Sequence, residues 1–117
     1  MTQISARIRI YFGTGLAIGP GRIELLEGVR RTGSLAQAAR GMSMSYRRAW
    51  LLMQSLNQAL GSPATIAAKG GRRGGGAALT PAGKALIRTY RRFENKATRE
   101  INKQFAGFAP RAAKRRG

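Results

Sequence analysis

The sequence predicts one mainly α-helical domain with a small β component, in which three helices are followed by a β-hairpin and a long final helix. Three observations lead to this fold class. Residues 34–60 hold a short and a longer segment of helical apolar period, separated by a tight turn. A basic, glycine-rich stretch follows at residues 64–79, and residues 80–105 return to a helical period. This order is typical of a winged helix-turn-helix, whose second helix in the motif enters the DNA major groove.

The charge balance favours a polyanionic partner. The 117 residues include 22 lysines and arginines against four acidic residues, for a net charge of +18. Such a charge opposes compaction unless a polyanion neutralises it, so we expect nucleic acid, and double-stranded DNA in particular, as the partner. A ribosomal or chromatin-like protein would share this balance, so charge alone does not choose between them.

Catalysis and metal binding are not expected. The chain has no Cys, His or Asp, which are the side chains on which nucleophilic, acid–base and metal chemistry mostly depend. We therefore predict a protein that is not an enzyme, with no catalytic residues, metal or cofactor. No apolar run approaches the roughly 18 residues of a membrane span, and no signal peptide is evident. These features predict a cytoplasmic, nucleoid-associated protein; a cationic membrane-surface protein is the weaker alternative, because the final helix offers no broad insertable face.

The chain begins with an expected strand. Apolar residues alternate with Arg7 and Arg9 across residues 4–12, which is the period of a half-buried strand. The glycine cluster at residues 13–21 could be taken for a dinucleotide-binding loop, but no acidic residue lies about 20 positions further on to hold a ribose. We therefore interpret it as a turn that leads into a helix with Pro20 near its start.

The first helix is expected at residues 21–31. Its apolar stripe consists of Ile23, Leu26 and Val29. Gly33 is the expected stop. We interpret Glu24 and Glu27 as ordinary surface residues that pair with the arginines following them on the same helix.

Residues 34–60 are predicted to form the helix-turn-helix. Ser34 is a good N-cap for the short helix, and Ser45 is a good N-cap for the longer one. Ala38 and Ala39 would let another helix approach closely. The turn between the helices has Ser43 where such motifs often have glycine.

The second helix of the motif is expected to place two arginines away from the core. Its core stripe would be Ala49, Leu52, Met53, Leu56 and Leu60. Arg47 points roughly 160° from the stripe, so we assign it a base-edge contact, and Arg48 on the flank a phosphate contact. Tyr46 and Trp50 lie at the boundary, and Leu51 falls on the outward face without an assigned role. The alternative is an ordinary amphipathic helix with a solvated, charged face.

Residues 64–79 are predicted to form two short strands around a flexible loop. Glycines leave few side chains there except Lys69, Arg72 and Arg73, so the backbone and these cations could approach a phosphate closely. An RGG-like RNA-binding segment is the rival interpretation of this stretch alone. Directly after a helix-turn-helix, a basic hairpin indicates a wing that lies along the DNA backbone or minor groove.

The last helix, capped by Thr80 with Pro81 in its first turn, is expected to reach residue 105 and to extend past the small core. Its apolar stripe is Leu86, Tyr90, Phe93, Ala97 and Ile101. One small domain cannot cover so long a stripe, so we predict a homodimer interface there; the alternative is a helix folded back on its own core. We thus expect a domain at residues 1–105 and a flexible basic tail at residues 106–117.

Three stretches together resemble a known family. Residues 19–23, 44–50 and 70–80 are similar to the N-terminal DNA-binding domain of the molybdate-responsive transcription regulator (ModE) family, which is related to the LysR-type winged helix. The resemblance covers about residues 19–100 and implies a prokaryotic homodimer on a palindromic operator. It places residues 46–48 in the recognition helix and the three loop cations in the wing.

One departure from that family is large. Members that sense molybdate carry a C-terminal oxyanion-binding region, whereas this sequence ends at Gly117, so we expect no specific molybdate binding. The predicted function is sequence-specific regulation of transcription; the alternative is a basic protein that coats DNA or RNA without sequence preference. The predicted DNA-contacting residues are Ser45, Tyr46, Arg47, Arg48, Gln54, Lys69, Arg72 and Arg73.

Overall fold

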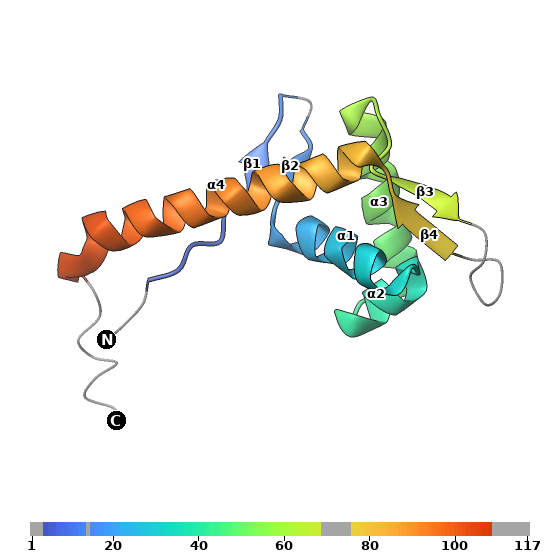
Figure 1. Cartoon of the computed structure of the whole chain (residues 1–117), viewed down its shortest axis with the longest axis horizontal. Coiled ribbons are helices and arrows are strands. Elements are labelled where there is room, and N and C mark those ends of the chain that lie inside the picture. Colours follow the sequence, from blue (N-terminus) through green and yellow to red (C-terminus); the bar gives the residue numbers. More distant parts are fainter. Residues whose placement is uncertain (1–3, 14, 69–75, 109–117) are drawn as a thin grey trace.

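The computed structural model describes residues 4–13, 15–68 and 76–108. The elements in chain order are β1 (Ile10–Tyr11), β2 (Ala17–Ile18), α1 (Pro20–Thr32), α2 (Leu35–Gly41), α3 (Tyr46–Leu60), β3 (Thr65–Ala68), β4 (Gly76–Leu79), α4 (Pro81–Phe105) and the 3₁₀ turn η1 (Ala106–Phe108). Helices α1–α3 and the β3–β4 hairpin gather around one end of α4, and the rest of α4 runs on past them (Figure 1). The predicted mainly α-helical winged helix-turn-helix with a long C-terminal helix is confirmed.

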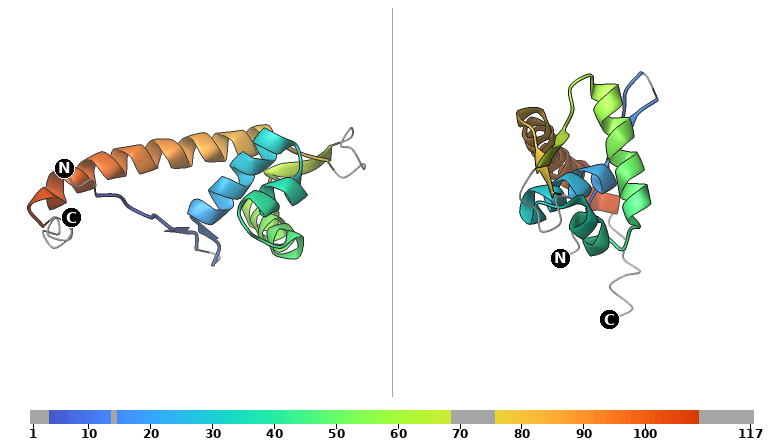
Figure 2. Two further views of the ribbon diagram at one scale, coloured as in Figure 1. Left: turned by 90° about the horizontal axis from the view of Figure 1, so that it is seen from below. Right: turned by 90° about the vertical axis from the view of Figure 1, so that its right-hand side faces the viewer.

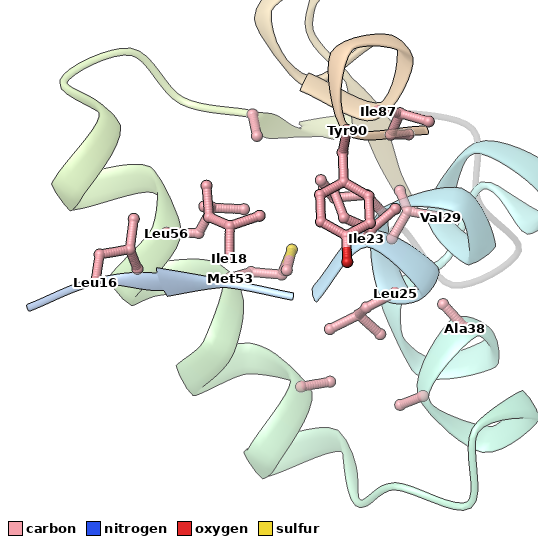
Figure 3. Packing of buried hydrophobic residues seen from close by; sticks show 14 residues of the cluster. Leu16, Ile18, Ile23, Leu25, Val29, Ala38, Met53, Leu56, Ile87 and Tyr90 are labelled. Atoms are coloured by element: carbon pink, nitrogen blue, oxygen red, sulfur yellow. The ribbon is translucent and has the colours of Figure 1, made fainter. Parts of the chain in front are cut away.

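Helix α1 lies at the centre of the core. Its apolar side chains are almost completely buried, and residues of β2, α2, α3 and α4 close around them (Figure 3). The core consists of Leu16, Ile18, Ile23, Leu25, Leu26, Val29, Ala38, Ala39, Ala49, Met53, Leu56, Ala64, Ile87 and Tyr90. The predicted stripe of α1 is thus confirmed, and Leu25 adds a second buried row, because α1 is covered on more than one side.

Small residues allow two close approaches in this core. A Cβ atom added to Gly28 of α1 would lie 2.8 Å from the Cβ of Ala38, so α1 and α2 touch almost backbone to backbone. A Cβ added to Gly83, in the first turn of α4, would overlap the carbonyl oxygen of Ala64. These contacts fix α2 and the start of α4 against the remainder of the domain.

The helix-turn-helix is held by the capping residues that the sequence indicates. The Ser34 hydroxyl accepts a hydrogen bond from the Gln37 N–H at 3.1 Å, and the Ser45 hydroxyl accepts one from the Arg48 N–H at 3.1 Å. Between the helices Ser43 adopts a φ of 54°, a left-handed conformation that favours glycine. The turn therefore forms with serine, at some cost in backbone strain.

The N-terminal segment departs from the expected strand. Only Ile10–Tyr11 pairs with another strand, β2, and residues 4–9 run alongside α4 instead (Figures 1 and 2). The side chain of Asn102 bonds both the N–H (3.0 Å) and the carbonyl (2.6 Å) of Ile4, and the Tyr90 hydroxyl donates to the Ile8 carbonyl at 2.6 Å. The predicted strand over residues 4–12 is therefore wrong except at Ile10–Tyr11, although the alternation persists in the burial: Ile4, Ala6 and Ile8 are half-buried, while Arg7 and Arg9 are exposed.

Helix α4 is tied to α1 by an ion pair that the sequence did not indicate. The Arg91 guanidinium donates to both carboxylate oxygens of Glu27, at 2.8 and 3.0 Å, and also to Glu94 at 2.6 Å. The expected pairing of Glu27 with arginines of its own helix is therefore wrong. The Arg91 guanidinium meets the Glu27 carboxylate with two hydrogen bonds, the bidentate geometry in which these two planar groups match. These bonds lower the pKa of Glu27 below its ordinary value, although burial partly offsets the effect.

The hairpin after α3 forms as predicted. Strands β3 and β4 pair antiparallel, from Thr65 opposite Leu79 to Ala68 opposite Gly76. Asn57 of α3 accepts from the Ala64 N–H at 2.7 Å, and the Ala77 N–H donates to the Gly33 carbonyl at 2.9 Å. The hairpin is thus attached to both α3 and the end of α1.

No helix in the described part of the chain is long and apolar enough to cross a bilayer.

Candidate nucleic-acid interface

The outward side of α3 carries the polar residues that were predicted to contact DNA. The Ser45 cap fixes the start of the helix, while Ala49 and Leu56 are 0% exposed and Met53 is 4% exposed on the opposite side. The predicted members of this surface on α3 are all exposed: Ser45, Tyr46, Arg47, Arg48 and Gln54. The burial pattern thus agrees with the predicted phase of the helix, and the side chains remain available to a ligand.

Aromatic and aliphatic side chains interrupt this polar surface. Tyr46 is 55% exposed, Trp50 is 44% exposed and Leu51 is 49% exposed. By contrast, Leu52 and Leu60 pack against the core, as their positions predicted. The outward side of α3 is therefore mixed in character, with hydrogen-bonding groups around an apolar strip.

An arginine from α1 braces the flank of α3. The Arg22 guanidinium donates to the Ala17 carbonyl of β2 at 2.8 Å and to the Ser55 hydroxyl of α3 at 2.9 Å. One side chain thereby connects the β1–β2 hairpin, α1 and α3. Its Nε is buried without a hydrogen-bond partner in the described structure.

The charges near Arg22 are positive. Burial lowers the pKa of Arg22, and the cations Arg9 and Arg48 lower it further. Arg48 and Ser55 lie seven positions apart, on the same side of α3. The N-terminal segment, α1 and α3 therefore gather cations at one flank of the helix, an arrangement that an anion such as a backbone phosphate would stabilise.

The three predicted wing contacts fall between strands β3 and β4 in the sequence. Lys69, Arg72 and Arg73 lie outside the described residues, between the two strands of the hairpin. The structure does describe β3 and β4 on either side of them, anchored next to the C-terminal end of α3 through Asn57. The described strands β3 and β4 are therefore joined to α3.

The apolar stripe of α4 is divided between two environments. Tyr90 is 2% exposed and belongs to the core of the protomer itself, so its assignment to a dimer interface is wrong. Leu86 packs against the same core. Phe93 is 48% exposed, whereas Ala97 and Ile101 are half-buried. Part of the stripe is thus covered by the chain itself, and Phe93 is its main exposed member.

Two contributors to this surface were missed from the sequence alone. Arg22 lies four positions before Leu26 and seven before Val29, on the same side of α1, so its side chain turns toward the protein. That spacing was a usable signal. The approach of Arg9 to Arg22 had no comparable signal, because it depends on how the β1–β2 hairpin folds back.

The family comparison matches more than half of the chain. Residues 21–84 match the family described as "Bacterial regulatory helix-turn-helix protein, lysR family". This match includes α1–α3, the hairpin and the first turn of α4.

Curated relatives are named for molybdenum and for transcription. The chain is 48% identical over 77 residues to the molybdenum-pterin-binding protein MopB of Rhodobacter capsulatus, covering 66% of this chain and 28% of MopB. It is 36% identical over 93 residues to the molybdenum transport protein ModE of Azotobacter vinelandii, covering 80% of this chain and 34% of that protein. It is 39% identical over 71 residues to the DNA-binding transcriptional dual regulator ModE of Escherichia coli K12, covering 61% of this chain and 27% of that regulator. The chain thus spans about a third or less of the length of these relatives.

Solved structures show the same fold. The crystal structure of the CbnR_DBD–DNA complex is similar with a TM-score of 0.58 and 26% sequence identity, covering 74% of this chain and 94% of that one. The structure of CbnR described as a LysR family transcriptional regulator gives a TM-score of 0.56 at 27% identity, covering 74% of this chain and 28% of that one.

Proposed function

Because the chain belongs to the lysR family of bacterial regulatory helix-turn-helix proteins, we propose that it regulates transcription by placing α3 in the major groove of a specific DNA sequence. The observation that carries the proposal is the orientation of α3. Its buried side is fixed by Ala49, Met53 and Leu56, so Arg47 and Gln54 project into solvent. An exposed arginine at the start of such a helix can bind guanine O6 and N7 with two hydrogen bonds.

The flank of α3 would bind the DNA backbone. Arg48 lies on this flank with Arg9 and Arg22 close by. A phosphate there would relieve the repulsion that Arg9 and Arg48 exert on Arg22 and would fix the register of α3 in the groove. Lys69, Arg72 and Arg73 would extend the backbone or minor-groove contact on the side of the hairpin.

The regulator would act as a homodimer on a palindromic operator. Phe93 is 48% exposed on α4, next to the half-buried Ala97 and Ile101, and a second copy of α4 would cover these side chains. Two copies of α3 would then read half-sites about one helical turn, or 34–36 Å, apart. Sedimentation equilibrium tests this step, and Phe93→Asp is expected to shift the protein toward the monomer.

The test of sequence reading compares two neighbouring arginines. Preferred duplexes are first selected from a random library with the full chain, and affinities are then measured for the preferred and for random duplexes. Arg47→Ala should weaken binding to the preferred duplex by about 5- to 150-fold, as for a lost bidentate base contact worth ~1–3 kcal/mol, and affect random duplex much less. Arg48→Ala should weaken both to a similar extent, since a phosphate contact carries no base information.

Arg99→Ala provides the control, because Arg99 is exposed on the distal part of α4. Equal loss for both duplexes in Arg47→Ala would exclude the assigned base contact. If random duplex competes as well as any selected one, the protein coats nucleic acid without sequence preference, an alternative that the +18 charge supports. The expected lack of specific molybdate binding stays a prediction, for which equilibrium dialysis with molybdate is the direct measurement.

A further inference from the structure

Leu51 is an exposed leucine on the outward side of α3, where an amphipathic helix normally carries polar residues. It is 49% exposed, whereas Leu56 on the other side of the same helix is 0% exposed. Taking about 100° per residue, Leu51 lies roughly 40° from the direction of Arg47 and roughly 60° from that of Gln54. An apolar side chain therefore stands within the surface that is otherwise built to hydrogen-bond.

Three of the four helical neighbours of Leu51 are residues assigned to DNA contact, and the fourth, Ser55, accepts a hydrogen bond from Arg22. Arg47 and Arg48 lie four and three positions before it, and Gln54 and Ser55 lie three and four positions after it, so all four adjoin it on the helix surface. Trp50, 44% exposed, extends the apolar strip on one side. A covering protein would have to exclude these polar groups from water as well, whereas the edge of a DNA groove offers both hydrogen-bonding atoms and methyl groups.

Building on the proposed function, we propose that Leu51 reads a thymine by contact with its C5-methyl group in the major groove. This methyl is the one apolar group that the four bases present there, and it distinguishes thymine from cytosine. Leu51 lies one helical turn from Arg47, a rise of about 6 Å, which equals about two base-pair steps of 3.4 Å. The thymine should therefore lie within about two base pairs of the guanine that Arg47 contacts.

The test removes one methyl group from the DNA and one side chain from the protein. In the selected duplex each thymine is replaced in turn by deoxyuridine, which lacks only the C5-methyl, and affinities are measured for the wild type and for Leu51→Ala. At the thymine that Leu51 contacts, deoxyuridine should weaken the wild type about fourfold, which corresponds to burial of one methyl group worth about 0.8 kcal/mol. Leu51→Ala should bind both duplexes equally at that position.

Two matched variants define the result. Leu51→Met keeps an apolar side chain of similar volume and should retain sensitivity to deoxyuridine at the same thymine. Ile66→Ala removes an apolar side chain that is 52% exposed on β3 and should also leave that sensitivity unchanged. The salt dependence of binding should be the same for Leu51→Ala as for the wild type, because no charge has been removed.

Several outcomes would overturn the assignment. Wild-type affinity that is indifferent to deoxyuridine at every thymine, or a Leu51→Ala variant that keeps the wild-type sensitivity, excludes a methyl contact by Leu51. A change in the DNA-free association state of Leu51→Ala would show that a second copy of the chain covers this surface. Failure of the proposed function is distinguishable, because the selection would then yield no preferred duplex at all, and the inference would fall with it.

Discussion

Replacing Gly83 in the first turn of α4 by alanine should destabilise the protein, whereas replacing Gly21 in the first turn of α1 by alanine should stabilise it. Alanine is normally favoured over glycine in a helix by about 0.5–1 kcal/mol, because glycine loses more backbone freedom on folding. At Gly21 a new Cβ would meet nothing within 4 Å. Gly21→Ala should therefore raise the free energy of unfolding by up to about this amount.

At Gly83 the added methyl group has no room. It would overlap the carbonyl oxygen of Ala64, which itself accepts a hydrogen bond from the Thr80 N–H at 3.0 Å. Forcing a methyl group into a packed site costs about 1–3 kcal/mol, and loss of the hydrogen bond costs about 1 kcal/mol more. After the helical preference of alanine is subtracted, Gly83→Ala should lower the free energy of unfolding by about 1–3 kcal/mol.

Urea unfolding followed by far-ultraviolet circular dichroism measures both variants against the wild type. All three should be compared at one protein concentration, because dimerisation would make stability depend on concentration. The midpoints should move in opposite directions with an unchanged m value. If Gly83→Ala is as stable as Gly21→Ala, the start of α4 does not pack on Ala64 as described.

Three further outcomes follow from contacts between distant parts of the chain. Tyr90→Phe removes the 2.6 Å hydrogen bond to the Ile8 carbonyl and should lower the free energy of unfolding by about 1 kcal/mol. Amide hydrogen exchange in residues 4–9 should become faster in this variant, and an unchanged rate would contradict the packing of this segment on α4. The carboxylate of Glu27 has a pKa below its ordinary value of 4.5, so the stabilisation it contributes is complete above pH 4.5 and is lost as the pH falls through the lowered pKa. Glu27→Gln should therefore flatten the dependence of the free energy of unfolding in urea on acid pH. An unchanged dependence on pH would contradict the pairing with Arg91. Arg48→Gln should reduce the slope of log affinity against log salt by about 0.9, the amount expected for one phosphate contact, and an unchanged slope would exclude that contact.

The helices, their ends and the outward side of α3 could all be inferred from the amino-acid sequence. These features depend on residues only a few positions apart: Ser45 caps the N–H of Arg48, Thr80 caps that of Gly83, and Gly61 ends α3 with a φ of 70°. The apolar period then sets which side of each helix is buried. Capping residues and apolar periodicity can be recognised within a short stretch of sequence, so they could be interpreted without coordinates.

Which surfaces the chain itself covers depends on contacts between residues that are far apart in the sequence. The N-terminal segment lies on α4 through contacts separated by 98 and 82 positions, and the Glu27–Arg91 pair spans 64. These contacts place Tyr90 in the core rather than at an interface. The sequence contains the same alternating residues whether they meet a strand or a helix, because an apolar side chain gains the same burial from either partner. The choice between partners depends on how the intervening chain brings them together, which no local pattern specifies.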